Sequence, residues 1–309
     1  MPKTQRAASP WLARRVLAYA HQGGAHEAPS STLAAVEHAL AVGATGIELD
    51  VHASADGVLV VCHDRTVDRT TNGRGRIAEM TWAELAALDN AYWFVPGEEH
   101  PRDRPADAYP LRGRAPADPT LRIARLEEVL DLLDEHPGVV LNLDIKATAP
   151  EVAPYEAALA ETLRRRGYEE RTIVASFWDV ATERFRALAP EIATSAGTVQ
   201  VASFWRAVHR GEPVGPLPYQ ALQVPARHGS LTVVDELLVH AAHEAHLAVH
   251  VWTVNDPLTM GSLVDLGVDG IITDRPSALV GILAAKGCAY DPTAPGARGD
   301  QRVAPPDPA

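Results

Sequence analysis

Cysteine is scarce in this chain of 309 residues, which contains only Cys62 and Cys288. Two cysteines do not make a disulfide framework in a chain of this length. Cys62 lies inside the apolar run VLVVCHD, where a thiol is expected to pack as a small buried hydrophobe. We therefore expect a fold held together by its core and not by disulfides.

Long apolar runs are also missing. No stretch approaches the roughly 18–20 apolar residues that a membrane-spanning helix needs. Arg14 and Arg15 interrupt the N-terminal segment where a signal peptide would have an unbroken apolar core. We expect a cytoplasmic protein without a transmembrane segment, and peripheral contact with a membrane stays open.

Positive charge is in deficit, since the formal net charge is −12, and no basic stripe with interleaved aromatic residues is present. Both observations argue against a nucleic-acid partner. The 46% hydrophobic content is normal for a globular protein with a full core. A small anionic substrate remains compatible with the acidic balance, because a metal ion or local donors can neutralise it. The oligomeric state is not indicated.

What the chain does have is a regular alternation of β-rich runs and amphipathic segments. The runs predict strands at 16–21, 45–52, 58–64, 139–146, 172–177, 193–197, 221–226, 248–255 and 270–274. Between them, apolar residues spaced by three and four predict helices, among them 119–138 and 231–246. This alternation favours an α/β fold, a (β/α)8 TIM barrel in which 58–64 is a hairpin partner of 45–52. An open doubly wound sheet is the alternative, but its glycine-rich dinucleotide loop is absent.

Two regions interrupt the alternation. Residues 90–120, an insertion after the second strand region, are rich in proline, arginine and aromatic residues without periodicity, as in a lid or a mobile loop. Residues 289–309 form a Pro/Ala-rich tail with the composition of a disordered segment. We expect a single barrel domain over 16–288, preceded by an N-terminal extension, 1–15.

Acidic residues stand near the ends of the predicted strands, where barrels of this kind carry their active sites. Glu48 and Asp50 are two residues apart, so their side chains leave one face of their strand, and Asp144 and Lys146 have the same spacing. Together they either form strand-end ion pairs or surround a cation. Oxygen donors of this kind suit Mg²⁺ or Ca²⁺ better than zinc. We expect a divalent metal site.

Two histidines lie at the ends of predicted strands: His21 ends the first strand, and His63 lies at the end of the hairpin partner, 58–64. Histidine titrates near neutral pH and suits acid–base catalysis. Cleavage of a phosphodiester needs a base, an acid and positive charge for the phosphoryl group. Four further histidines are expected at the surface or in packing and not as metal ligands, because they are divided between a predicted helix and the next strand. They are His240, His243, His246 and His250.

These features together resemble the glycerophosphodiester phosphodiesterase family, a metal-dependent barrel family related to phosphatidylinositol-specific phospholipase C. The resemblance spans residues 16–285 and rests on HQGG (21–24), GIELDV (46–51), DG (56–57), HD (63–64), DRTTNGRG (68–75), LNLDIK (141–146) and WTVN…LGVDGIITDRP (252–276). It implies hydrolysis of glycerophosphodiesters to glycerol 3-phosphate and an alcohol, within lipid and glycerol metabolism. Two alternatives stay open: a lysophospholipase D-like activity, and a binding module that has lost catalysis.

The resemblance also implies roles for individual residues. They are an acid–base pair of His21 and His63, a Mg²⁺ or Ca²⁺ site of Glu48, Asp50 and Asp144, and a phosphate contact from Lys146. In the family's usual mechanism a substrate hydroxyl attacks the phosphate, and water then opens the cyclic phosphate. Which histidine acts first as the base is left open. Trp252, at a strand end, either lines the substrate pocket or packs in the core.

Three positions depart from the family pattern. Gln22 stands where the family has arginine, so a neutral amide faces the phosphate and binding depends more on the metal and Lys146. Ser30 stands where the family has glutamate, and nearby Glu27 is a candidate replacement. Asp144 is one methylene shorter than the family's usual glutamate. Because the histidines and the acidic pair on the second strand are retained, we expect an active enzyme with an altered substrate preference.

Overall fold

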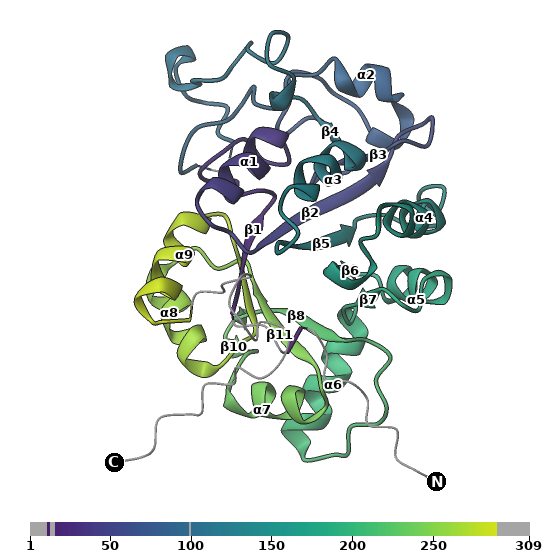
Figure 1. Cartoon of the computed structure of the whole chain (residues 1–309), viewed down its shortest axis with the longest axis vertical. Helices are drawn as coiled ribbons and strands as arrows, with labels where there is room; N and C mark the ends of the chain where they lie inside the picture. The colour runs from purple at the N-terminus through teal and green to yellow at the C-terminus, as the bar shows by residue number, and fades with distance from the viewer. Residues whose placement is uncertain (1–10, 13–15, 99, 289–309) are drawn as a thin grey trace.

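The barrel is the central feature of the computed structural model, which describes residues 11–12, 16–98 and 100–288. Within them, eight parallel strands follow one another around a ring in chain order (Figure 1). They are β1 (Leu17–His21), β2 (Gly46–Ala53), β5 (Val140–Ile145), β6 (Thr172–Ala175), β7 (Ala193–Thr194), β8 (Ala221–Pro225), β11 (Ala248–Trp252) and β12 (Gly270–Thr273). β12 pairs with β1, and a parallel bridge between Ser195 and Ala221 joins β7 to β8. The predicted (β/α)8 barrel is confirmed.

A helix follows each barrel strand and lies on the outside of the ring (Figure 1). These helices are α1 (Leu33–Ala41), α3 (Leu126–Asp134), α4 (Glu156–Arg166), α5 (Asp179–Leu188), α6 (Thr198–Arg210), α7 (Glu236–Glu244), α8 (Pro257–Leu266) and α9 (Pro276–Ala285). Local sequence sets several of their ends. Asp256 caps the N-terminus of α8 by accepting from the Thr259 backbone, and Gly267 ends the same helix in the left-handed conformation.

An antiparallel hairpin extends the second barrel strand. β3 (Leu59–Val61) pairs with β2 through a turn at Asp56 and Gly57, as predicted, and β3 in turn pairs with β4 (Ala124–Arg125). The chain between β3 and β4 contains the insertion and forms a lobe at the top of Figure 1. Its short helices are η1 (Ile77–Glu79), α2 (Trp82–Ala86), η2 (Ala106–Ala108) and η3 (Pro119–Leu121). Elsewhere two further short segments complete the elements, η4 (Glu169–Arg171) and the hairpin of β9 (Arg227–His228) with β10 (Leu231–Thr232).

The insertion is built around Arg112. Its guanidinium lies 3.7 Å from the ring centre of Tyr109 and 4.6 Å from the ring centres of both Tyr92 and Trp93. The aromatic residues of the insertion therefore stabilise the insertion itself. The predicted tail, 289–309, lies outside the described residues, as does the N-terminal extension except for Trp11 and Leu12. In the part of the chain that the structure describes, no helix is long and apolar enough to cross a membrane.

Aromatic rings fill one end of the barrel. The ring of His250 on β11 lies 5.1 Å from that of Tyr19 on β1 and 6.3 Å from that of Trp11. Gly270 on β12 is required beside them, because a Cβ there would lie only 2.9 Å from Cδ2 of His250. This packed layer leaves the other end, where the strands terminate, free to form a site.

Candidate active site

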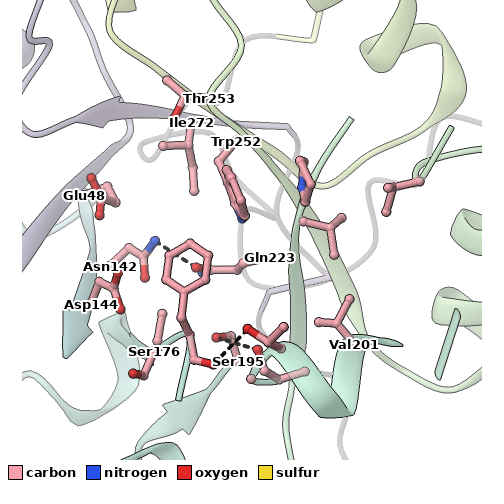
Figure 2. Close-up of a pocket in the computed structure, with 18 of the residues that line it drawn as sticks. Glu48, Asn142, Asp144, Ser176, Ser195, Val201, Gln223, Trp252, Thr253 and Ile272 are labelled. Carbon is pink, nitrogen blue, oxygen red and sulfur yellow. Dashed lines mark hydrogen bonds between the residues drawn. The ribbon is translucent and has the colours of Figure 1, made fainter. Parts of the chain in front are cut away.

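A cavity of about 660 Å³ opens at the C-terminal ends of the barrel strands. Six of the eight predicted site residues line it: His21, Glu48, His63, Asp144, Lys146 and Trp252. Figure 2 shows Glu48 and Asp144 on one side of the cavity, with Trp252 reaching toward its centre. Asp50 is fully buried next to this lining, and Gln22 is buried beside His21. The structure thus gathers the predicted residues at one end of the barrel.

His21 is held in place by a carboxylate. Its Nδ1 lies 2.6 Å from Oδ1 of Asp274, which directly follows β12, and Asn255 donates to the other Asp274 oxygen at 2.7 Å. Burial lowers the pKa of His21, but the Asp274 hydrogen bond and the charge of Glu48 outweigh it and raise the pKa to about 9. This pairing orients the ring and leaves Nε2 as the nitrogen that does not face Asp274.

His63 is held in the same way. Its Nδ1 lies 2.7 Å from Oδ1 of Asp64, and Arg69 donates to Oδ2 of Asp64 at 2.7 Å. Although burial acts to raise the pKa of Asp64, its hydrogen bonds with His63 and Arg69 hold that pKa well below its usual value. The ring centres of His21 and His63 are 6.1 Å apart, with their planes at 81°. Two histidine–carboxylate pairs therefore meet at one cavity.

A lysine lies between two of the three predicted carboxylate ligands. Asp50 on β2 is in register with Asp144 on β5, and Nζ of Lys146 lies 2.8 Å from Asp50 Oδ1 and 2.7 Å from Asp144 Oδ2. Burial raises the pKa of Asp144, whereas for Asp50 the Lys146 charge outweighs burial and lowers the pKa. Burial and the charge of Asp50 raise the pKa of Glu48 to about 8. These shifts favour the neutral forms of Glu48 and Asp144, as expected where three carboxylates crowd around one lysine.

The polar groups of this cluster are incompletely satisfied. Oδ2 of Asp50 and Oδ1 of Asp144 are buried without a hydrogen-bond partner. Among the described residues, no three His, Cys, Asp or Glu side chains are already arranged to hold a metal ion. Carboxylate oxygens are the ligands that Mg²⁺ or Ca²⁺ prefers, and in this structure Lys146 is the cation that contacts those of Asp50 and Asp144. A metal would add to this lysine contact or take its place.

The HQGG segment makes a tight left-handed turn after β1. Gln22, Gly23 and Gly24 have φ values of 52°, 82° and 98°. The glycines are needed for close packing as well as for conformation, since a Cβ on Gly23 would lie 2.6 Å from Cβ of Ala35 in α1. The turn brings the Gln22 backbone N–H within 3.1 Å of Oε2 of Glu48, to which it donates. The sharp turn expected of these glycines is present.

Two of the departures from the family motif are in contact with each other. The hydroxyl of Ser30 donates to Oε1 of Gln22, and Nε2 of Gln22 lies 3.2 Å from Nε2 of His21. Where the family pattern has arginine and glutamate, this chain therefore has a neutral amide–hydroxyl pair. Glu27 does not replace the missing glutamate, because it accepts from His38 and Ser277.

The opposite wall of the cavity was not predicted from the sequence, apart from Trp252. Its apolar residues come from the loop after β6, from α6 and from the chain around β10: Phe177, Val201, Trp205, Leu231 and Val233. The rings of Trp252 and Phe177 are in edge-to-face contact, with centres 5.4 Å apart. Among the described residues that line the cavity, none belongs to 90–120, so the described part of the insertion does not form its wall. Asp274, the partner of His21, could have been found from the sequence, because it is a carboxylate at the end of the predicted strand 270–274.

Comparison with known proteins places these observations in a family. The model of the glycerophosphoryl diester phosphodiesterase family matches residues 21–278. A glycerophosphodiester phosphodiesterase from Caldanaerobacter subterraneus is 30% identical over 277 residues, covering 88% of this chain and all of the relative. One from Bacillus altitudinis is 29% identical, covering 85% of this chain and 96% of the relative.

Solved structures agree with the family match. The glycerophosphodiester phosphodiesterase from Agrobacterium tumefaciens is 27% identical with a TM-score of 0.63, covering 86% of this chain and 98% of that chain. A phosphodiesterase from Oleispira antarctica was solved with the product sn-glycerol-3-phosphate. It is 25% identical with a TM-score of 0.63, covering 86% of this chain and 96% of that chain. The chain therefore belongs to the glycerophosphodiester phosphodiesterase family of enzymes.

Proposed function

We propose that this enzyme uses a divalent metal ion and an acid–base pair, His21 and His63, to hydrolyse glycerophosphodiesters to glycerol 3-phosphate and an alcohol. The observation that carries the proposal is the facing pair of histidines, 6.1 Å apart, each with a carboxylate on Nδ1. The product bound to the Oleispira antarctica relative supports glycerol 3-phosphate as the product here.

The two histidines would exchange protons with the substrate. One imidazole takes the proton of a glycerol hydroxyl next to the phosphate as that oxygen bonds to phosphorus. The bond from phosphorus to the alcohol oxygen breaks, and the other histidine, as imidazolium, gives its proton to that oxygen. A water molecule then opens the cyclic phosphate with the proton transfers reversed. Asp274 and Asp64 keep each ring in the tautomer that this exchange requires.

A metal ion fits the donor set in charge and in chemistry. Once ionised, the three carboxylates of Glu48, Asp50 and Asp144 carry more charge than Lys146 balances, and a divalent cation would favour their ionised forms. Two buried carboxylate oxygens there lack a hydrogen-bond partner. We propose that these three carboxylates hold Mg²⁺ or Ca²⁺. When bound, the ion would supply positive charge to the phosphoryl oxygens, a charge that Lys146 supplements.

Release of glycerol 3-phosphate from glycerophosphocholine and glycerophosphoethanolamine tests this proposal. We expect turnover with Mg²⁺ or Ca²⁺ and none after EDTA treatment, with recovery when the metal is restored. The matched control is His240→Ala, on the outer helix α7, which should retain full activity. Turnover that survives both EDTA and the substitution of either catalytic histidine would refute the proposed site.

A further inference from the structure

The cavity is much larger than its catalytic end. Pockets of about 300–1,000 Å³ hold ligands of drug size, whereas glycerol 3-phosphate has only a handful of heavy atoms. The volume of about 660 Å³ extends from the carboxylates and histidines across to α6 and the β9–β10 hairpin. Figure 2 shows this extent, with Glu48, Asn142 and Asp144 on one side and Val201 on the other. The far half, around Phe177, Val201, Trp205, Leu231 and Val233, is called the outer chamber below.

The outer chamber offers few hydrogen bonds to a ligand. The indole N–H of Trp205 already donates to the carbonyl of Val233 at 3.1 Å. The hydroxyl of Ser176 donates to the carbonyl of Ile145, and that of Thr198 donates to the carbonyl of Phe177. Gln223 is an exception on the cavity wall, since its Oε1 accepts from Asn142 but its Nε2 has no hydrogen-bond partner. The rest of the surface toward the cavity is mostly hydrocarbon and ring surface. Among the described residues lining the cavity outside its catalytic end, His228 is the one titratable side chain.

A cationic headgroup fits this chamber poorly. Aromatic rings bind quaternary ammonium groups when their faces are available. Here Nζ of Lys146 already lies 5.6 Å from the centre of the Phe177 ring, and Trp252 meets that ring edge to face. The Phe177 ring is thus already in contact with Lys146 and Trp252, which leaves less of its face available to a quaternary ammonium group. An uncharged apolar group does not need a free ring face.

The mouth of the chamber is apolar as well. Phe177 is 51% exposed, Trp178 beside it is 48% exposed, and Leu231 on β10 is 44% exposed. Val199, which follows the lining residue Thr198 in α6, is 68% exposed, and its backbone N–H donates to Asp179 at the start of α5. Phe177 and Leu231 both line the cavity and reach the surface, and exposed apolar side chains at a cavity usually mark a binding surface. These exposed side chains would contact the end of a hydrocarbon chain that is longer than the chamber.

We propose that the outer chamber binds an uncharged apolar chain or ring attached to the substrate phosphodiester, so that the enzyme prefers amphiphilic phosphodiesters to fully polar ones. The inference rests on the proposed function, because it places the phosphate at the catalytic end of the same cavity. The apolar group enters either as the leaving alcohol or as an acyl chain on the glycerol. The shared chemistry is a hydrocarbon of several carbons beside a phosphodiester.

A chain-length series tests this inference. Glycerophosphodiesters of ethanol, butanol and octanol are compared below their micelle concentrations. For the acyl arm, glycerophosphoethanol is compared with its 1-butanoyl and 1-octanoyl esters. Burying a methylene is worth about fourfold in binding, so kcat/KM should rise about 100-fold or more from the shortest to the longest chain of the favoured arm, even if only about half of the added methylenes are buried. Equal kcat/KM values along both arms would overturn the inference while leaving the proposed function intact.

Two variants locate the effect. Val201→Asn places a polar group of similar size in the chamber and should reduce the octyl-to-ethyl ratio of kcat/KM about tenfold. Leu258→Asn, at a position that is 82% exposed on α8, should leave that ratio unchanged. An unchanged ratio in Val201→Asn would refute the assignment of the chamber.

A binding measurement separates this inference from the proposed function. If no phosphodiester were turned over, the proposed function would fail. Calorimetric affinities of ethyl phosphate and octyl phosphate would then still decide the inference. Tighter binding of octyl phosphate, weakened by Val201→Asn, would support the chamber, and equal affinities would overturn it.

Discussion

His21 on β1 and His250 on β11 lie in the same barrel but in opposite surroundings. His21 lines the cavity, and its Nδ1 has a carboxylate partner 2.6 Å away. Both ring nitrogens of His250 lack a hydrogen-bond partner, and the ring packs against Tyr19. The pKa of His21 is raised to about 9, whereas burial lowers that of His250 to about 3. Position along the strand, more than residue type, decides whether a histidine serves the reaction or the core.

The difference has a simple geometric origin. Residues two apart leave the same face of a strand, so β1 directs Tyr19 and then His21 inward, and β11 directs His250 and then Trp252. The earlier residue of each pair enters the packed layer, and the later one reaches the cavity. A shift of two residues therefore changes a core position into a site position.

Removing a cavity histidine should have the largest effect. His63→Ala is expected to lower kcat/KM about 1,000-fold, because a proton donor or acceptor is lost. Thermal unfolding should change little, since the His63 side chain is 35% exposed. Initial-rate kinetics and calorimetry on the same preparation measure both quantities. Retention of more than a tenth of the activity would remove His63 from the proposed mechanism.

Asp274→Asn tests how far the carboxylate partner matters. The expected loss in kcat/KM is about 100-fold, because the amide neither fixes the His21 tautomer nor stabilises its charged form. Asp274 raises the pKa of His21, so the pH–rate limb that reports His21 should move to lower pH in the variant. A loss of activity without any movement of that limb would indicate a structural role for Asp274 only.

The buried histidine should be visible in stability and not in rate. His250 has a folded pKa of about 3, below the unfolded value of about 6.5. Between these values the unfolded state binds more protons, so stability falls as pH drops from about 6.5 toward 3. Through His250 alone, the free energy of unfolding should be lower at pH 5 than at pH 7.5 by about 2 kcal/mol. His250→Leu should remove that part of the pH dependence.

Urea unfolding at pH 7.5 and pH 5 measures this difference. His52 and His100 also have pKa values lowered by burial, to about 4, so the wild type must be measured beside the variant. An unchanged pH dependence in His250→Leu would show that His250 is not the group responsible. Activity per folded molecule at pH 7.5 should stay close to that of the wild type.

The neutral pair beside His21 should give the smallest effect. Gln22→Arg alone buries a charge where Ser30 offers only a hydroxyl, and Ser30→Glu alone buries an unpaired carboxylate. Combined, they restore the charge pair of the family motif. We expect the double variant to be more stable than the sum of the single effects by about 1 kcal/mol. Additive free energies of unfolding would show that the two positions are not coupled.

The barrel itself was predictable from the sequence because its signals are local and repeated. Near-continuous apolar runs marked several of the barrel strands, and glycine or proline stops marked many helix ends. The polar site was predictable for a related reason. Histidines and carboxylates at the ends of apolar strands stand out, and parallel strands bring those ends together.

The outer chamber was not predictable, because its residues have no distinctive local pattern. Residues 231–246 predict one helix, yet α7 begins only at Glu236, where Asp235 caps it. The chain before it forms β10 and places Leu231 and Val233 in the cavity wall. An apolar residue that lines a cavity has the same sequence signature as one in the core. The contact between Gln22 and Ser30 likewise needed coordinates, since eight positions separate them in the chain.

The most direct test of this account measures His21→Ala and His250→Leu side by side. Each variant is assayed for glycerol 3-phosphate release at pH 7.5 and for its free energy of unfolding. We predict that His21→Ala loses about 1,000-fold in kcat/KM while remaining folded, and that His250→Leu keeps its kcat/KM per folded molecule. Full activity in folded His21→Ala would contradict the assignment of the reaction to the C-terminal end of the barrel.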